Sequence, residues 1–220
     1  MQHPQTSRRG CYHHYKALVT LALIIQTELT TPQIEILLCE HMGYLAVLDP
    51  KVSNSSSVEY KKKVNGRQTL SIIIKQATIN DLETLYRIER ECFTIEAFSK
   101  QHLTHLLETS GATSLVALMD NAIAGFIVGL ISGHDKEING RIYTLDVAVK
   151  YRRKGVGLRL LDEIERVFVE KGARTCYLEV RKDNTAALEL YRKRGYIEVK
   201  ELKDYYKGAH GVRLKKKLAV

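Results

Sequence analysis

The stretch YRRKGVGLRL, residues 151–160, places two glycines two positions apart, immediately before an apolar helical pattern. Basic residues surround the glycines on both sides, at Arg152, Arg153, Lys154 and Arg159. A glycine turn exposes backbone N–H groups without obstruction by Cβ atoms, and the helix that follows adds the positive end of its dipole. The sequence therefore predicts an anion site, suited to a pyrophosphate, where a strand gives way to a helix.

Two better-known phosphate motifs do not fit this stretch. A Walker A loop requires Gly-x-x-x-x-Gly-Lys-Ser/Thr, and the chain contains no such string. A dinucleotide fingerprint requires a third glycine three residues after Gly157, where the chain has Leu160. What remains is Arg152-x-x-Gly155-x-Gly157. A basic loop whose glycines only permit a tight turn is the alternative that these residues leave open.

The elements around this loop follow a mixed α/β pattern. Apolar residues at helical spacing predict helices over 79–93, 99–108, 155–170 and 184–195. Alternating or β-branched apolar runs predict strands over 70–78, 113–132 as a hairpin, 140–149, 174–180, 196–202 and 210–218. This order predicts a mixed sheet with helices packed on it.

The first third of the chain contains no motif. Residues 50–68 are polar and basic without apolar periodicity, which is typical of a linker. We therefore expect two parts: an N-terminal extension over 1–68, either poorly ordered or upstream of the true start, and a domain over 69–220. The apolar run 17–25 is too short to span a membrane and is not followed by a cleavage site, so we expect a short helix or strand there.

Composition narrows the class of partner. The net charge of +9 is spread along the chain, which favours solubility over nucleic-acid binding. The four cysteines are isolated, with no metal-ligand spacing, so we expect a cytoplasmic protein without a metal site. We expect no membrane partner, and either a monomer or a homodimer.

Three separated blocks resemble one family. Residues 152–157 resemble the acetyl-CoA pyrophosphate loop of the GNAT N-acetyltransferases. LEVRKDNTAALELYRKRGY (178–196) and IERECFTIEAFSKQHL (88–103) resemble segments of RimI-like and archaeal protein N-terminal acetyltransferases. The resemblance covers about 71–217. It implies the GNAT fold, an α/β mixed architecture with a central splayed sheet of about seven strands and about four helices on its faces.

The resemblance also implies how acetyl-CoA is held. The sheet opens between the strands 141–147 and 174–180, with the thioester against the first of them and the pyrophosphate over the glycine loop. The implied contacts are Leu145, Asp146, Val147, Arg152, Arg153, Lys154, Gly155, Val156, Gly157, Leu158 and Asn184. From its residues alone, Asn184 also fits a plain helix cap.

The chemistry implied is attack of a neutral amine on the thioester, which requires a base for the amine and an acid for the departing thiolate. Strand alternation puts Glu179 opposite Cys176, Leu178 and Val180, so it can face the cleft as the base; a surface ion pair with Arg181 or Lys182 is the alternative. Tyr191 is the candidate acid, and core packing is its alternative. Both roles are those that the resemblance implies.

The resemblance implies a protein or peptide N-terminus as the acceptor, with a ribosomal protein as a candidate. An α-amine, with a pKa near 8, is also easier to deprotonate than lysine at about 10.4, so it asks less of the base. A small amine, a lysine side chain, or a non-catalytic acyl-CoA- or RNA-binding module are the alternatives. The acceptor contacts implied are Phe93, Ile95, Phe98, Tyr205 and Tyr206, for which hydrophobic packing is the alternative. FTIEAF lacks the family's usual proline, and YYKGAHGVRLKK lacks the ending familiar from RimI.

Overall fold

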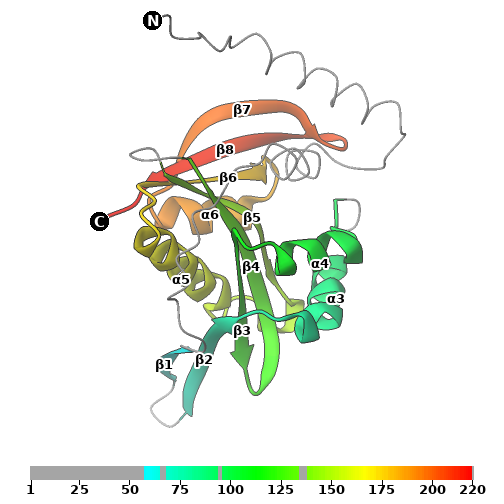
Figure 1. Ribbon diagram of the computed structural model, residues 1–220, viewed down its shortest axis with the longest axis vertical. Helices are drawn as coiled ribbons and strands as arrows, with labels where there is room; N and C mark the ends of the chain where they lie inside the picture. The colour runs from blue at the N-terminus through cyan, green and yellow to red at the C-terminus, as the bar shows by residue number, and fades with distance from the viewer. Residues whose placement is uncertain (1–56, 65–67, 94–95, 134–137, 220) are drawn as a thin grey trace, which may run out of the picture. The chain divides into compact units, whose positions relative to one another are not determined.

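A computed structural model describes residues 57–64, 68–93, 96–133 and 138–219, with the backbone alone for 62–64 and 68–70 (Figure 1). Within these residues the chain forms one sheet of eight strands, in the order β1-β2-β3-β4-β5-β6-β8-β7. The strands are β1 (Val58–Val64), β2 (Gln68–Gln76), β3 (Ala112–Met119), β4 (Ala122–Ser132), β5 (Asn139–Val147), β6 (Thr175–Arg181), β7 (Ile197–Tyr206) and β8 (Ala209–Lys217). Neighbouring strands run antiparallel except β5 and β6, which are parallel.

Four α-helices cover the sheet in the described part of the chain: α3 (Leu82–Cys92), α4 (Lys100–Glu108), α5 (Val156–Glu170) and α6 (Thr185–Lys193). Figure 1 shows α3 and α4 on one side of the central strands and α5 on the other. Ser99 caps α4 by accepting a hydrogen bond from the His102 amide. Among the described helices, none is both long and apolar enough to cross a membrane. The mixed α/β fold is confirmed, with one strand more than the seven predicted.

The additional strand is β1, in a stretch that the sequence indicates to be a linker. That interpretation is wrong for Val58–Val64, which pairs with β2 along its whole length. Three consecutive lysines interrupt the apolar alternation by which a strand is predicted. β1 is the edge of the sheet, however, where lysines are common because they discourage pairing with another chain. The Tyr60 hydroxyl also donates to Glu163 of α5 at 3.2 Å. Residues 1–56, including the apolar run 17–25, lie outside the described residues.

The sheet opens between β5 and β6. The two strands pair only from Asn139 opposite Thr175 to Ile142 opposite Leu178, and beyond that point each pairs only with its outer neighbour. A bulge begins where the pairing ends: Val128 of β4 faces Thr144 and Gly129 faces Ile142, so Tyr143 is an extra residue in β5. A bulge bends its strand and increases the local twist, which accounts for the divergence of β5 from β6. The predicted opening is confirmed.

The core on the α5 side is built around Phe168, which is fully buried. Its ring lies where a side chain at position 140 would have to be, since a Cβ on Gly140 would come within 2.2 Å of the ring. The glycine at that position is therefore required by close packing of α5 on β5. The largest fully buried side chains are Phe126, Phe168, Ile74, Leu85, Leu103, Leu106, Met119, Ile127, Leu160, Leu161, Ile164 and Leu178.

Candidate active site

The start of α5 has the features of an anion site. Its N-cap is Gly155, with φ +91°, a left-handed conformation that glycine adopts without strain. Glycine has no side chain to cap the helix, so the first-turn amides of Val156, Gly157 and Leu158 receive no side-chain acceptor. A Cβ added to Gly155 would meet no heavy atom within 4 Å, so the space beside this glycine is open. Binding of a pyrophosphate here stays a prediction.

The basic residues before Gly155 divide into two groups. Arg153 and Lys154 are exposed beside the open amides. Arg152 turns back instead: its Nε donates to the carbonyl of Val147 at 3.0 Å, and its Nη2 lies 3.4 Å from Cys92 Sγ. Arg152 therefore fastens the loop to the end of β5 and to α3. Its predicted contact with acetyl-CoA stays a prediction.

The end of β5 forms one wall of the opening. A Cβ added to Gly157 would lie 3.5 Å from the side chain of Val147, so Val147 faces the start of α5. Asp146 is buried, with 1% of its surface exposed, whereas Leu145 and Val147 are partly exposed. The structure thus places the predicted thioester-side residues and the predicted pyrophosphate loop next to each other.

Glu179, on β6, is held by two arginines. Its Oε2 accepts hydrogen bonds from Nε and Nη2 of Arg141 at 3.0 and 2.9 Å. Its Oε1 accepts from Nε of Arg213 at 2.6 Å. The side chain of Glu179 is 7% exposed. The alternative of a surface pair with Arg181 or Lys182 is wrong, because Arg181 pairs with Glu96 and Asp183, and Lys182 pairs with Glu201.

Three tyrosines converge on the same region. Tyr191 is buried, and burial, followed by the charge of Asp146, raises its pKa above the usual value. Burial also raises the pKa of Tyr206, with contributions from Tyr205, Glu179 and Tyr191. The Tyr205 hydroxyl accepts from Arg141 Nη2 at 3.4 Å, and the rings of Tyr205 and Tyr206 meet edge to face at 5.1 Å. The predicted base, acid and acceptor-side tyrosines therefore share one site.

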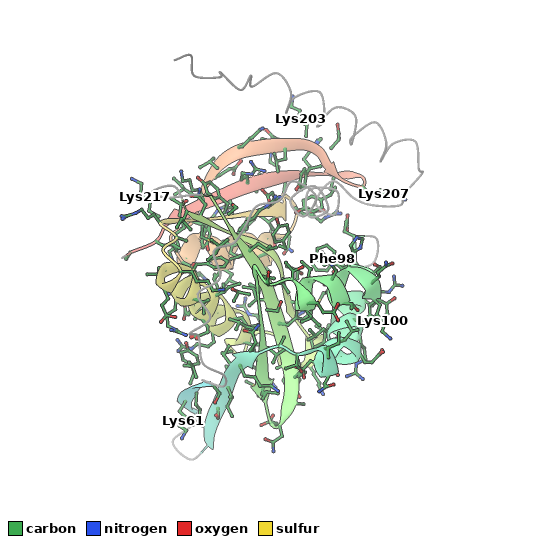
Figure 2. All side chains as sticks on the ribbon, viewed as in Figure 1. Lys61, Phe98, Lys100, Lys203, Lys207 and Lys217 are labelled. Atoms are coloured by element: carbon green, nitrogen blue, oxygen red, sulfur yellow. The ribbon has the colours of Figure 1, made fainter. Side chains whose placement is uncertain are left out.

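The remaining predicted residues are placed less closely. Asn184 caps α6 by accepting from the amide of Ala187 at 3.1 Å, so its capping role is confirmed and its contact with acetyl-CoA stays a prediction. Phe98 is buried at the N-terminal end of α4, which fits the packing alternative (Figure 2). Phe93 is half-buried. Ile95 lies outside the described residues.

The sequence did not indicate the arginines that hold Glu179. Arg213 lies directly opposite Glu179 because β6 and β8 pair in that register, and Arg141 comes from the parallel neighbour on the other side. A one-residue slip in either register would have removed these partners, and nothing in the sequence of one strand specifies its register with another. Lysines lie at both edges of the sheet: Figure 2 shows Lys61 on one edge strand and Lys203 on the other.

The model of the acetyltransferase (GNAT) family matches residues 82–196, which include the end of β5, the glycine loop, Glu179 and Tyr191. The chain belongs to the GNAT acetyltransferase family. It is therefore an acyltransferase, as its sequence predicts. Among the described residues, no three or more side chains of His, Cys, Asp or Glu form a group that could hold a metal ion.

Several proteins similar to this acetyltransferase are archaeal. It is 28% identical over 158 residues to an N-alpha-acetyltransferase of Saccharolobus solfataricus, covering 68% of this chain and 92% of the relative. It is 30% identical over 142 residues to an N-alpha-acetyltransferase of Sulfurisphaera tokodaii, covering 60% and 84%. Its structure is similar to that of Ard1 from Thermoplasma volcanium, with a TM-score of 0.62, 27% identity and coverage of 68% and 99%.

Proposed function

We propose that this acetyltransferase moves the acetyl group of acetyl-CoA to the α-amino group at the N-terminus of a protein or peptide. The observation that carries the proposal is the opening between β5 and β6, which has the bare amides of α5 at one side and Glu179 with three tyrosines at the other. The archaeal relatives named N-alpha-acetyltransferase support the same acceptor.

The chain offers acetyl-CoA a cradle of backbone groups. The amides at the start of α5 would bind the pyrophosphate, with Arg153 and Lys154 adding positive charge. The backbone of Leu145, Asp146 and Val147 would hold the thioester end, and Asn184 the pantetheine arm. Acetyl-CoA supplies the activated acetyl group. The protein supplies position and proton transfer, so neither a metal nor an acyl-enzyme intermediate is needed.

Glu179 is the proposed proton acceptor for the attacking amine. A carboxylate has about four acceptor positions, and the arginines occupy two on Oε2 and one on Oε1. One position on Oε1 therefore remains for a water molecule, which would pass the proton from the amine. The two arginines also keep the carboxylate fixed, because each of its two oxygens is held by charge-assisted hydrogen bonds from a different strand.

Tyr191 is the proposed proton donor to the departing CoA thiolate. Burial beside the charge of Asp146 raises its pKa, so the phenol carries its proton at neutral pH. A thiolate leaving in the same buried region would also be destabilised as an anion, which would favour transfer of the proton to it. The amine thus loses a proton to Glu179 as the thiolate gains one from Tyr191.

The acceptor is tested by its chemistry. Acetyl-CoA and a library of short peptides would be incubated with the full chain, and mass spectrometry would identify which nitrogen carries the acetyl group. We expect acetylation of free α-amines and none of the same peptides with blocked N-termini that retain a lysine. Acetylation of lysine or polyamines instead would contradict the proposed acceptor. A ribosomal-protein N-terminus and a cytoplasmic location belong to the same proposal, and ribosomal N-terminal sequences are included in the library for that reason.

A further inference from the structure

Two carboxyl groups lie next to each other inside the protein, and the proposed chemistry uses neither. Glu89 is on α3 and Asp146 is on β5, and each residue is 1% exposed. Burying a charged carboxylate without a cation is unfavourable. No ion pair to either side chain is found among the described residues. The two groups therefore require another explanation for their burial.

One oxygen of each carboxyl has a donor. Glu89 Oε1 accepts from the amide of Phe98 at 2.9 Å, and Asp146 Oδ2 accepts from the hydroxyl of Thr144 at 2.9 Å. The other two oxygens, Glu89 Oε2 and Asp146 Oδ1, are buried and find no N–H or O–H donor in the described part of the chain. Glu89 and Asp146 lie close enough for the charge of Asp146 to raise the pKa of Glu89, and each has a buried oxygen left for a hydrogen bond between the two side chains. Ionised carboxylates only accept, so such a bond requires a proton on one of them.

The surroundings of the pair favour keeping that proton. Cys92 of α3 and Tyr191 of α6 are the other titratable groups that face it, and neither is a cation. The nearby guanidinium of Arg152 bonds Cys92 and the carbonyl of Val147. Burial, with the charge of Asp146, raises the pKa of Glu89 well above its usual value. Burial raises the pKa of Asp146 to about 7.

We propose that Glu89 and Asp146 share one proton at neutral pH, and that this proton fastens the acceptor side of the site to the open end of β5. Through its other oxygen, Glu89 holds the amide of Phe98, at the end of the segment that precedes α4. Asp146 lies one residue before Val147, where β5 ends. The proposed function places neither carboxyl group against a substrate, although the backbone of Asp146 lines the thioester end, so both side chains are positioning groups.

The proposal has a directional consequence for pH. When the shared proton is lost at alkaline pH, two adjacent buried carboxylates repel each other and the contact between α3 and β5 is weakened. Turnover of the wild type then falls as pH rises. Replacing either carboxyl by an amide removes this fall. In Asp146→Asn the amide oxygen accepts from Thr144 and the amide nitrogen donates to Glu89. In Glu89→Gln the amide oxygen accepts from Phe98 and the nitrogen donates to Asp146.

The test compares turnover of these variants with that of wild type on one peptide and acetyl-CoA, from about pH 7 to about pH 10. Taking the ratio to wild type cancels the ionisation of the acceptor amine. We expect the ratio for both variants to rise with pH, approaching about tenfold per pH unit once the shared proton is lost in wild type. The matched control is Glu83→Gln on the same helix, which removes an exposed carboxylate paired with Lys100 and whose ratio should stay flat. Flat ratios for both pair variants would overturn the proposal.

A second measurement detects the shared proton directly and does not depend on enzyme turnover. Carboxyl ¹³C NMR of wild-type protein should show one protonated side-chain carboxyl at neutral pH, assigned to this pair. Two ionised carboxyls throughout the neutral range would overturn the proposal even if the variants fail to fold. Only the turnover effect rests on the proposed function. If no peptide is acetylated, the proposed function is wrong, and the NMR result still tests whether the two carboxyls share a proton.

Discussion

Glu179 depends on partners that come from strands on both of its sides. Arg141 on β5 and Arg213 on β8 donate three hydrogen bonds to its carboxylate, so the group is fixed at the mouth of the opening. A fixed, largely buried carboxylate with one acceptor position left suits a base that acts through water. The role of Glu179 can be separated from its packing by a change that keeps the shape of the side chain.

We expect Glu179→Gln to lower kcat by about 10²-fold or more, because general-base catalysis typically contributes 10²–10⁴-fold. Binding of acetyl-CoA, measured by calorimetry, should change little, since Glu179 lies on the acceptor side. Glu201→Gln is the matched control: it removes a carboxylate from β7, which β8 separates from β6 and where Glu201 pairs with Lys182. Unchanged turnover in Glu179→Gln would remove this residue from the mechanism.

Tyr191→Phe should lower kcat more than it lowers affinity for acetyl-CoA, because only the hydroxyl proton is lost while the ring remains. Tyr196→Phe provides the comparison, since Tyr196 is also buried and its ring packs on that of Tyr191 at 5.6 Å. We expect that variant to retain turnover. If the Tyr191 variant loses affinity while its turnover survives, Tyr191 serves packing rather than proton transfer.

Residues with a local signal are the ones that the sequence could predict. Glu179 follows from strand alternation and Asn184 from capping chemistry, both within a few neighbouring positions. The partners of Glu179 and the pairing of Glu89 with Asp146 depend on registers and helix placement between distant segments. No local pattern encodes such contacts, so the sequence allowed the candidate residues to be proposed but not their hydrogen bonds.

At the scale of elements, the start of α5 is the proposed site for the pyrophosphate of acetyl-CoA. Gly155 and Gly208 both have positive φ, +91° and +74°, and both would hold an added Cβ in open space. Gly155→Asp and Gly208→Asp therefore impose a similar backbone strain, about 1–2 kcal/mol. They differ in where they place a negative charge.

We expect Gly155→Asp to abolish measurable binding of acetyl-CoA, because its carboxylate would lie over the bare amides of α5 and compete with the pyrophosphate. Gly208→Asp, in the turn between β7 and β8, should bind acetyl-CoA like wild type. Calorimetric titration of both variants makes the comparison. Equal affinities would show that the glycine loop is a turn without an anion site.

Elements with strong periodicity were predicted well, and those shaped by their neighbours were not. The buried face of α5, with Leu160, Leu161, Ile164 and Phe168, follows directly from helical spacing. β1 was missed because its lysines resemble a linker, and it becomes a strand only by pairing with β2. The bulge at Tyr143 was missed because it exists only in relation to β4.

For the whole molecule, the buried carboxyl pair predicts how stability depends on pH. Folding raises the pKa of Asp146 from 3.8 to about 7. Below about pH 7 the folded protein therefore keeps, besides the proton shared with Glu89, a second proton on Asp146 that the unfolded chain releases. The stability that this proton confers is complete below about pH 4 and is lost as pH rises towards about 7, by at most about 1.4 kcal/mol per pH unit. Asp146→Asn removes this loss.

The melting temperature of Asp146→Asn minus that of wild type, measured by calorimetry, should therefore increase as pH rises from about 5 to about 8. At acid pH both carboxyls are protonated in the folded and in the unfolded protein, so the two states bind the same number of protons and this effect on stability vanishes. A difference in melting temperature that is constant over this range would mean that Asp146 is ionised in the folded protein.

The central claim is that the gap where β5 leaves β6 receives acetyl-CoA. A crystal structure of the full chain with CoA tests it most directly. We predict the pyrophosphate against the amides of residues 155–158 and the pantetheine arm between β5 and β6, ending near Tyr191. CoA bound elsewhere, or β5 and β6 paired along their whole length, would contradict the account.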